Sequence, residues 1–208
     1  MLDSLKISLH DPLTRNKGLD PSDPSNSLDN RSTKQKVIEM GLEYLDGAGA
    51  NILCTVCIPN GGSCCLGCRF LEHGVGCQQR NTSCTAWLCG FLKFILYEAG
   101  LIKEWETFWD QVPGLYFRKD FTPDHFLVYK WLDVPNVRLL SEAFAEDLKE
   151  LKKNKHSYWL LEIKDTLERY VNKILSSDDP DVTKNMEKKI RYFIKDFKHF
   201  HLAKEQLV

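Results

Sequence analysis

Residues 85–100 read TAWLCGFLKFILYEAG, and apolar side chains occupy most positions of this stretch. Lys93 and Glu98 are its only charged residues, and Gly100 supplies a stop signal at its end. A helix that is apolar nearly all round has to be covered by other elements. We therefore expect these residues to form a helix at the buried centre of the fold.

Three longer stretches follow, each with the spacing of an amphipathic helix. Apolar residues recur in them at intervals of three or four, which places them on one helical face. The stripes are Val137, Leu140, Phe144, Leu148 and Leu151; Leu160, Ile163, Leu167, Val171 and Ile174; and Val182, Met186, Ile190, Phe193, Phe197 and Phe200. Asp179 and Pro180 form a cap and first-turn pair for the last stretch. The pattern predicts a mainly α protein built as a helical bundle.

Shorter elements are predicted between these helices and before them. Ser32 and Gln35 fit a capping box, so a short helix should start there and end at the glycines near residue 47. Further helices are expected over 102–112 and 124–132, where Pro123 offers a first-turn residue. A short extended piece is expected over 115–121.

The chain ends and the composition indicate the domain organisation. Residues 1–31 combine prolines with Asp, Ser and Asn and lack apolar periodicity, which predicts an extended or disordered arm. Residues 32–208 are then a single helical domain, as a chain of 208 residues with 43% hydrophobic residues allows. No run approaches the roughly 18 apolar residues that cross a bilayer, so we expect no membrane partner.

A glycine-rich region separates the first helix from the buried one. Seven of the twelve glycines lie between Gly47 and Gly76, together with most of the cysteines. This composition is typical of an irregular loop, and a loop of that length in a compact domain needs an organising agent. We expect a bound metal to supply it, so that a metal-stapled cysteine- and glycine-rich loop lies near the N-terminal end of the bundle.

The cysteines carry the strongest chemical signal. All eight lie within residues 54–89: Cys54, Cys57, Cys64, Cys65, Cys68, Cys77, Cys84 and Cys89. Two C-x-x-C pairs occur among them, and that spacing lets two sulfurs converge on one ion. All eight are candidate metal ligands, in one site or in two. Four thiolates suit tetrahedral zinc and an iron–sulfur cluster alike, and both remain open.

The redox compartment bears on this interpretation. The N-terminal residues lack the apolar core of a secretory signal, so we expect a cytoplasmic protein. Thiols stay reduced there, and a dense cysteine cluster is more often metal-binding than a disulfide framework. The alternatives are a disulfide framework and, for Cys89, a small buried apolar residue.

The stretch CTVCIPNGGSCCLGCRFLEHGVGCQQRNTSCTAWLC, residues 54–89, resembles the zinc- or iron-chelating cysteine-cluster family. Members carry a C-x-x-C, then Gly-x-Cys-Cys, then further single cysteines. Here Cys54 with Cys57, residues 62–65, Cys77 and Cys84 stand in that order. The resemblance implies a bound zinc or iron–sulfur cluster, and some members are attached to protein methylase activity.

Three functions compete on these grounds. The first is a metal-binding helical protein that acts as an accessory or interaction component of a larger assembly, with a protein partner. The second is an iron–sulfur-dependent redox enzyme or its cluster-carrying subunit. No nucleotide-binding, metalloprotease or hydrolase motif occurs, so the sequence leaves open whether the chain is an enzyme and names no catalytic residue.

The third function is nucleic-acid binding by the basic last helix. Cations and aromatics are interleaved there: Lys188, Lys189, Arg191, Lys195 and Lys198 beside Tyr192, Phe193, Phe197 and Phe200. The phenylalanines fall on the apolar stripe, so we expect them to be core residues and the cations to lie on a solvated face. The net charge of −1 also argues against a nucleic-acid partner.

Overall fold

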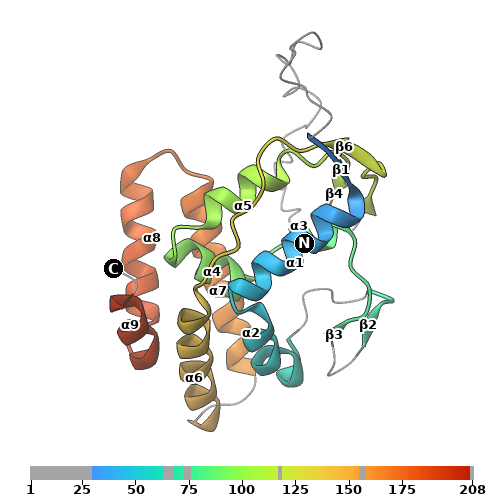
Figure 1. Ribbon diagram of the computed structural model, residues 1–208. Helices are drawn as coiled ribbons and strands as arrows, with labels where there is room; N and C mark the ends of the chain where they lie inside the picture. The colour runs from blue at the N-terminus through green and yellow to red at the C-terminus, as the bar shows by residue number, and fades with distance from the viewer. Residues whose placement is uncertain (1–29, 63–67, 73–75, 117–118, 155–157, 207–208) are drawn as a thin grey trace, which may run out of the picture.

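A computed structural model describes residues 30–62, 68–72, 76–116, 119–154 and 158–206 (Figure 1). Helices dominate these residues, which confirms the mainly α prediction. The helices are α1 (Lys34–Gly47), α2 (Ala50–Cys57), the 3-10 helix η3 (Ile58–Asn60), α3 (Thr82–Ala86), α4 (Gly90–Glu98), α5 (Ile102–Trp109), α6 (Arg138–Asn154), α7 (Tyr158–Leu175), α8 (Pro180–Phe193) and α9 (Lys198–Glu205). None of the described helices is long and apolar enough to cross a lipid bilayer.

Three two-stranded antiparallel sheets complete the described part of the chain. They pair β1 (Arg31–Thr33) with β6 (His125–Leu127), β2 (Leu71–Glu72) with β3 (Gly76–Cys77), and β4 (Leu115–Tyr116) with β5 (Lys119–Asp120). The β2–β3 hairpin projects from the side of the helical body (Figure 1).

The helix α4 lies at the centre of the fold, as its sequence predicts. Phe91, Phe94, Ile95 and Leu96 are completely buried. On one side α4 packs against α7, which packs in turn against α8; α6 packs against both α2 and α9. Phe144 of α6 contacts the rings of both Phe91 and Phe94, at 5.6 and 5.2 Å between centroids. Aromatic packing thus joins the central helix to its neighbours.

The prediction of one continuous helix over residues 85–99 is wrong at its start. The chain forms the short helix α3, passes through extended backbone at Trp87 (φ −79°, ψ 129°), and begins α4 at Gly90. The break is stabilised by tertiary contacts, because the Trp105 indole N–H donates to the carbonyl of Ala86 at 3.0 Å. Gly90 then lies directly against the backbone of α7.

The helix predicted over residues 124–132 is also wrong. Residues 125–127 form β6, which pairs with β1 in a register that sets Ser32 opposite Phe126. The ladder extends on both sides: Val128 N–H donates to Asn30 O at 2.9 Å, and Lys34 N–H donates to Asp124 O at 3.1 Å. The backbone N–H and C=O groups of this segment form their hydrogen bonds with residues 30–34, and this pairing takes the place of the hydrogen bonds of a local helix.

The β1 strand also bears on the expected N-terminal arm, residues 1–31. Arg31 belongs to β1 and Asn30 supports its ladder. Residues 1–29 lie outside the described residues. The start of α1 differs from the predicted capping box, because the Thr33 hydroxyl, not that of Ser32, accepts the Lys36 N–H at 3.2 Å. Ser32 points inward instead and is 3% exposed.

The region predicted to be an irregular loop, residues 47–76, is partly helical. Gly49 adopts φ +77°, a left-handed conformation that turns the chain directly from α1 into α2. Leu53 and Val56 bury one face of α2. Cys54 and Cys57 are therefore spaced i, i+3 on a helix. The glycines on both sides of α2 favoured the incorrect prediction of a loop.

The three apolar stripes of the C-terminal half are largely confirmed. Most of their members are buried, and Val137, Leu151, Val182, Met186 and Phe193 are half-buried. The third stripe belongs to two helices, because the chain breaks after Phe193 and α9 begins at Lys198. Asp179 caps α8 as predicted, its side chain accepting the Asp181 N–H at 2.9 Å.

A buried carboxylate fastens the β4–β5 hairpin to the rest of the fold. The side chain of Asp120 is 6% exposed and pairs with the Lys34 ammonium at 2.9 Å. It also accepts the backbone N–H groups of Thr82 at 3.1 Å and Thr122 at 3.0 Å. Burial alone would raise the pKa of Asp120, but the hydrogen bonds from Thr82, Lys34 and Thr122 outweigh it and hold the pKa at about 2.

Asp120→Asn should lower the free energy of unfolding by about 2 kcal/mol at pH 7, because the folded carboxylate has a pKa well below the ordinary value near 3.9. This stabilisation is fully present above pH ~4 and is lost as the pH falls from about 4 towards 2. Urea unfolding of both proteins at several pH values measures the difference. It should shrink below pH ~4, and the exposed control Asp196→Asn should change stability by less than about 0.5 kcal/mol. An equal loss at pH 7 and pH 2 would contradict the assignment.

Candidate metal centre

Three of the predicted cysteine ligands lie near one another where α2 faces the start of α4. Cys54 and Cys57 lie one helical turn apart on α2, and Cys89 is the N-cap residue of α4. Cys57 and Cys89 are buried, with 9% and 6% of their surface exposed, and Cys54 is half-buried. We call Cys54, Cys57 and Cys89 the inner thiol group. Residues 32 to 35 positions apart in the sequence are thus brought together by the packing of two helices.

The inner thiols influence one another electrostatically. Burial, and then the Cys89 thiol, raise the pKa of Cys57 to about 12. Burial and Cys89 likewise raise the pKa of Cys54. Each thiolate would be desolvated and would face a neighbouring negative charge, so the protonated forms are favoured until a cation enters.

Two cations oppose this effect. Arg80 lowers the pKa of Cys54 and Lys164 lowers that of Cys57. The Lys164 side chain is only 13% exposed, and its ammonium lies 3.5 Å from Asp165. Neither cation is predictable from the sequence, because no spacing relates them to the cysteines and only tertiary packing brings them near.

The backbone after α2 runs tightly over the Cys57 thiol. Gly62 donates its N–H to the Cys57 carbonyl at 3.0 Å, following the left-handed turn at Gly61 (φ +80°). A Cβ atom on Gly62 would lie 2.0 Å from the Cys57 Sγ, so only glycine fits. The chain then continues into residues 63–67. Cys64 and Cys65 lie there, outside the described residues.

The inner thiols are close but not in contact as a set. Among the described residues, no three cysteines bring their Sγ atoms within 4.8 Å of one another. No disulfide joins any two of the six described cysteines.

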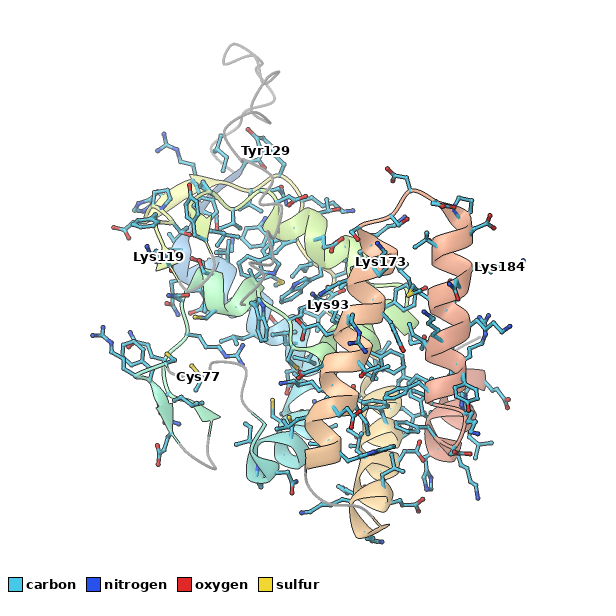
Figure 2. All side chains as sticks on the ribbon, turned by 180° about the vertical axis from the view of Figure 1, so that it is seen from behind. Cys77, Lys93, Lys119, Tyr129, Lys173 and Lys184 are labelled. Atoms are coloured by element: carbon cyan, nitrogen blue, oxygen red, sulfur yellow. The ribbon has the colours of Figure 1, made fainter. Side chains whose placement is uncertain are left out.

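The other described cysteines, Cys68, Cys77 and Cys84, lie in the segment of the chain that connects α2 to α4. Cys68 precedes the β2–β3 hairpin, and Cys77 lies on β3, away from the helical body (Figure 2). The Cys77 thiol donates to the Gln79 carbonyl at 2.9 Å. Cys84 lies in the first turn of α3, where its N–H donates to the Asn81 side chain at 2.8 Å. All three are partly exposed.

A second cluster of metal-ligand types occurs at the start of α9. Within the described ranges, Asp147, Glu150 and His199 bring ligand atoms within 4.8 Å of one another. Both Asp147 oxygens are already engaged, since they accept the N–H groups of His199 at 3.2 Å and Phe200 at 2.8 Å. The carboxylate thus caps α9, which explains its burial without a metal.

No protein-family model, curated protein or solved structure matches this chain. The resemblance of residues 54–89 to the zinc- or iron-chelating cysteine-cluster family stays a prediction from the sequence.

Proposed function

We propose that this chain binds a metal through thiolates of the inner group, Cys54, Cys57 and Cys89, and serves as an accessory component of a protein assembly. The observation that carries the proposal is the convergence of these three thiols from two helices. Isolated buried cysteines are common as small apolar residues, but a metal centre needs several thiols near one another, and the packing of α2 near the start of α4 provides three. Cys64 and Cys65 are the candidates for completing the ligand set.

The spacing of the thiols favours an iron–sulfur cluster over zinc. Four sulfurs on one zinc ion lie about 3.8 Å apart, given a Zn–S distance of about 2.3 Å and tetrahedral geometry. In a four-iron cluster each thiolate binds a different iron, so the sulfurs lie farther apart. The inner thiols do not fall within 4.8 Å of one another as a set, so in this arrangement they are too far apart to share one zinc ion.

The positive charges near the inner group agree with a thiolate centre. Four thiolates carry more negative charge than a zinc ion or a common iron–sulfur core compensates, so the occupied site is anionic. Arg80 and Lys164, which already act on Cys54 and Cys57, would offset part of that charge.

The accessory role is supported by the β4–β5 hairpin, which presents two aromatic rings to solvent. Phe121 is 66% exposed and Tyr116 is 47% exposed, and their rings meet edge to face at 5.6 Å. The hairpin is held to the cysteine-rich region by Ser83, whose hydroxyl donates to the Lys119 carbonyl at 2.7 Å. Exposed aromatics on a rigid support are typical anchors for a protein partner.

The test of the proposal is metal analysis with an ultraviolet–visible spectrum of the full chain, purified without air. Iron and inorganic sulfide with a brown colour are expected. A colourless protein with stoichiometric zinc would reject the cluster and keep the thiolate site. A protein free of both metals, which stays so after reconstitution with iron and sulfide or with zinc, would overturn the proposal.

A further inference from the structure

The exposed side of α8 and of the turn after it carries a local excess of positive charge. From Asp181, in the first turn of α8, to Lys198 the chain contains six basic and three acidic residues, although the whole chain has a net charge of −1. One of the acids, Glu187, is occupied, because it pairs with Arg191 at 3.8 Å and accepts the Tyr97 hydroxyl at 2.9 Å. The positive and negative charges nearly cancel over the whole chain, but the basic residues are concentrated on this part of the surface.

Three lysines form a stripe on the solvent side of this segment. Lys184, Lys188 and Lys195 are exposed, and none of them forms an ion pair with another residue that the structure describes. Lys184 and Lys188 lie one turn apart, about 6 Å along the helix axis. Figure 2 shows Lys184 on the outer side of α8, facing away from the helical body.

An exposed aromatic ring lies beside the stripe. Tyr192 is 73% exposed, the most exposed large apolar or aromatic side chain among the described residues. The Lys195 ammonium lies 4.9 Å from the centre of its ring. The ring therefore contributes little to the core, unlike Phe197 and Phe200, which are buried as the apolar stripe predicts.

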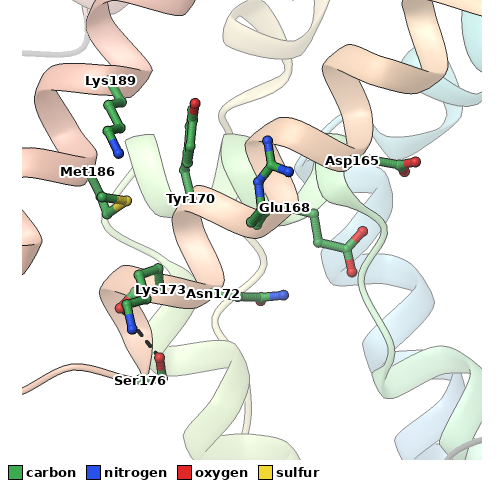
Figure 3. Close-up of a pocket in the computed structure, with 9 residues that line it drawn as sticks. Asp165, Glu168, Tyr170, Asn172, Lys173, Ser176, Met186 and Lys189 are labelled. Atoms are coloured by element: carbon green, nitrogen blue, oxygen red, sulfur yellow. Dashed lines mark hydrogen bonds between the residues drawn. The ribbon is translucent and has the colours of Figure 1, made fainter. Parts of the chain in front are cut away.

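The positive surface continues from α8 into a shallow groove against α7 (Figure 3). Lys189 of α8 and Arg169 and Lys173 of α7 line the groove around Tyr170. The Arg169 and Lys189 side chains lie 5.6 and 6.0 Å from the centre of the Tyr170 ring. Two acids, Asp165 and Glu168, lie at the other end of the groove, so its positive part is the end nearest α8 (Figure 3).

Helix geometry joins these two parts into one surface. At 100° per residue, the solvent stripe of Lys184 and Lys188 passes through Tyr192 to Lys189 at the edge of the groove. Glu187 lies about 60° from Lys184 around the axis of α8 and is engaged by the Tyr97 hydroxyl of α4 and by Arg191. We call the surface of Lys184, Lys188, Lys189, Tyr192, Lys195, Arg169 and Lys173 the α7–α8 basic face.

We propose that the α7–α8 basic face binds single-stranded nucleic acid without sequence preference. Lysines suit phosphates as flexible point charges, and an exposed tyrosine offers a base a stacking surface. An acidic protein is the competing partner. Lysine is depleted at the core of protein–protein interfaces, however, and five of the six cations of this face are lysines. The proposal is independent of the metal centre, whose proposed ligands lie on α2 and at the start of α4.

The test is binding of a fluorescently labelled oligothymidine to the full chain by anisotropy, at salt concentrations from 50 to 200 mM. The triple variant K184A/K188A/K195A should bind at least tenfold more weakly at the lowest salt. Its plot of log affinity against log salt should be shallower by about 2, from roughly 0.7 for each lost phosphate contact. The control K103A/K152A/K153A removes the same charge from exposed positions on α5 and α6 and should leave affinity within about twofold.

Tyr192→Ala provides a second test that is independent of charge. It should weaken binding about tenfold through lost stacking, while the salt dependence stays as in the unaltered protein. Three results would overturn the proposal: no binding by the unaltered chain at 50 mM salt, equal weakening by the two triple variants, or tighter binding of a polyglutamate peptide than of the oligonucleotide. The last result would assign the surface to an acidic protein. Circular dichroism of each variant is the control that its helix content equals that of the unaltered protein.

Discussion

Cys57→Ser is expected to remove most of the bound metal from the purified protein. Cys57 is the more buried of the two inner thiols on α2, and Cys89 and Cys54 both raise the pKa of its thiol. A serine hydroxyl is a hard, weakly acidic group that binds zinc or iron–sulfur clusters poorly compared with thiolate. Loss of one ligand should lower metal affinity at least 10- to 100-fold, with a lower melting temperature because metal binding contributes to folding.

The matched control is Cys77→Ser on the β2–β3 hairpin. Its thiol is engaged with the Gln79 carbonyl and lies outside the inner group, so the metal held by the inner thiols should remain. Metal content and the visible spectrum of both variants, purified in parallel without air, make the comparison. Full metal content in Cys57→Ser would contradict the ligand assignment. Equal losses in both variants would place Cys77 in the same centre.

Gly90→Ala is expected to destabilise the fold by about 3 kcal/mol, although alanine is the better helix former. A Cβ atom at Gly90 would lie 2.1 Å from the Lys164 carbonyl oxygen and 2.9 Å from the Glu168 Cβ. These atoms belong to the backbone and the first side-chain carbon of α7, so relief requires α4 and α7 to move apart. That movement would disturb the contact on which the buried centre depends.

Urea or thermal unfolding measures the effect of Gly90→Ala. Asn185→Ala is the matched control, because it also introduces a good helix former but at an exposed position of α8. It should be neutral or stabilise by up to about 0.6 kcal/mol. Unchanged stability of Gly90→Ala would show that α4 and α7 can separate at little cost.

The elements predicted correctly are those whose signal is local. The residues of α4 are apolar nearly all round the helix and are buried accordingly, and the apolar stripes of α6, α7 and α8 repeat every three or four positions, as their burial does. The Asp179–Pro180 start of α8 is equally local, since both residues act within the first helical turn. No partner elsewhere in the chain is needed to specify these features.

The errors arise where a distant partner decides the structure. Residues 125–127 form a strand because residues 31–33 pair with them, nearly a hundred positions earlier. The break between α3 and α4 is stabilised by Trp105, and the end of the third stripe becomes a separate helix capped by Asp147. Hydrophobic periodicity describes one segment at a time and contains no information about such pairings.

The amino-acid sequence alone determined that this protein is mainly α, that α4 is buried, and that a dense group of thiols precedes it. Tertiary packing decided which thiols are neighbours, because Cys89 joins Cys54 and Cys57 only when α4 packs near α2. Tertiary packing also decided where the cations gather on the surface. The net charge is a sum over all charged residues and does not show which of them are neighbours. Periodicity and composition are properties of the chain, whereas proximity and surface charge depend on how the helices pack in space.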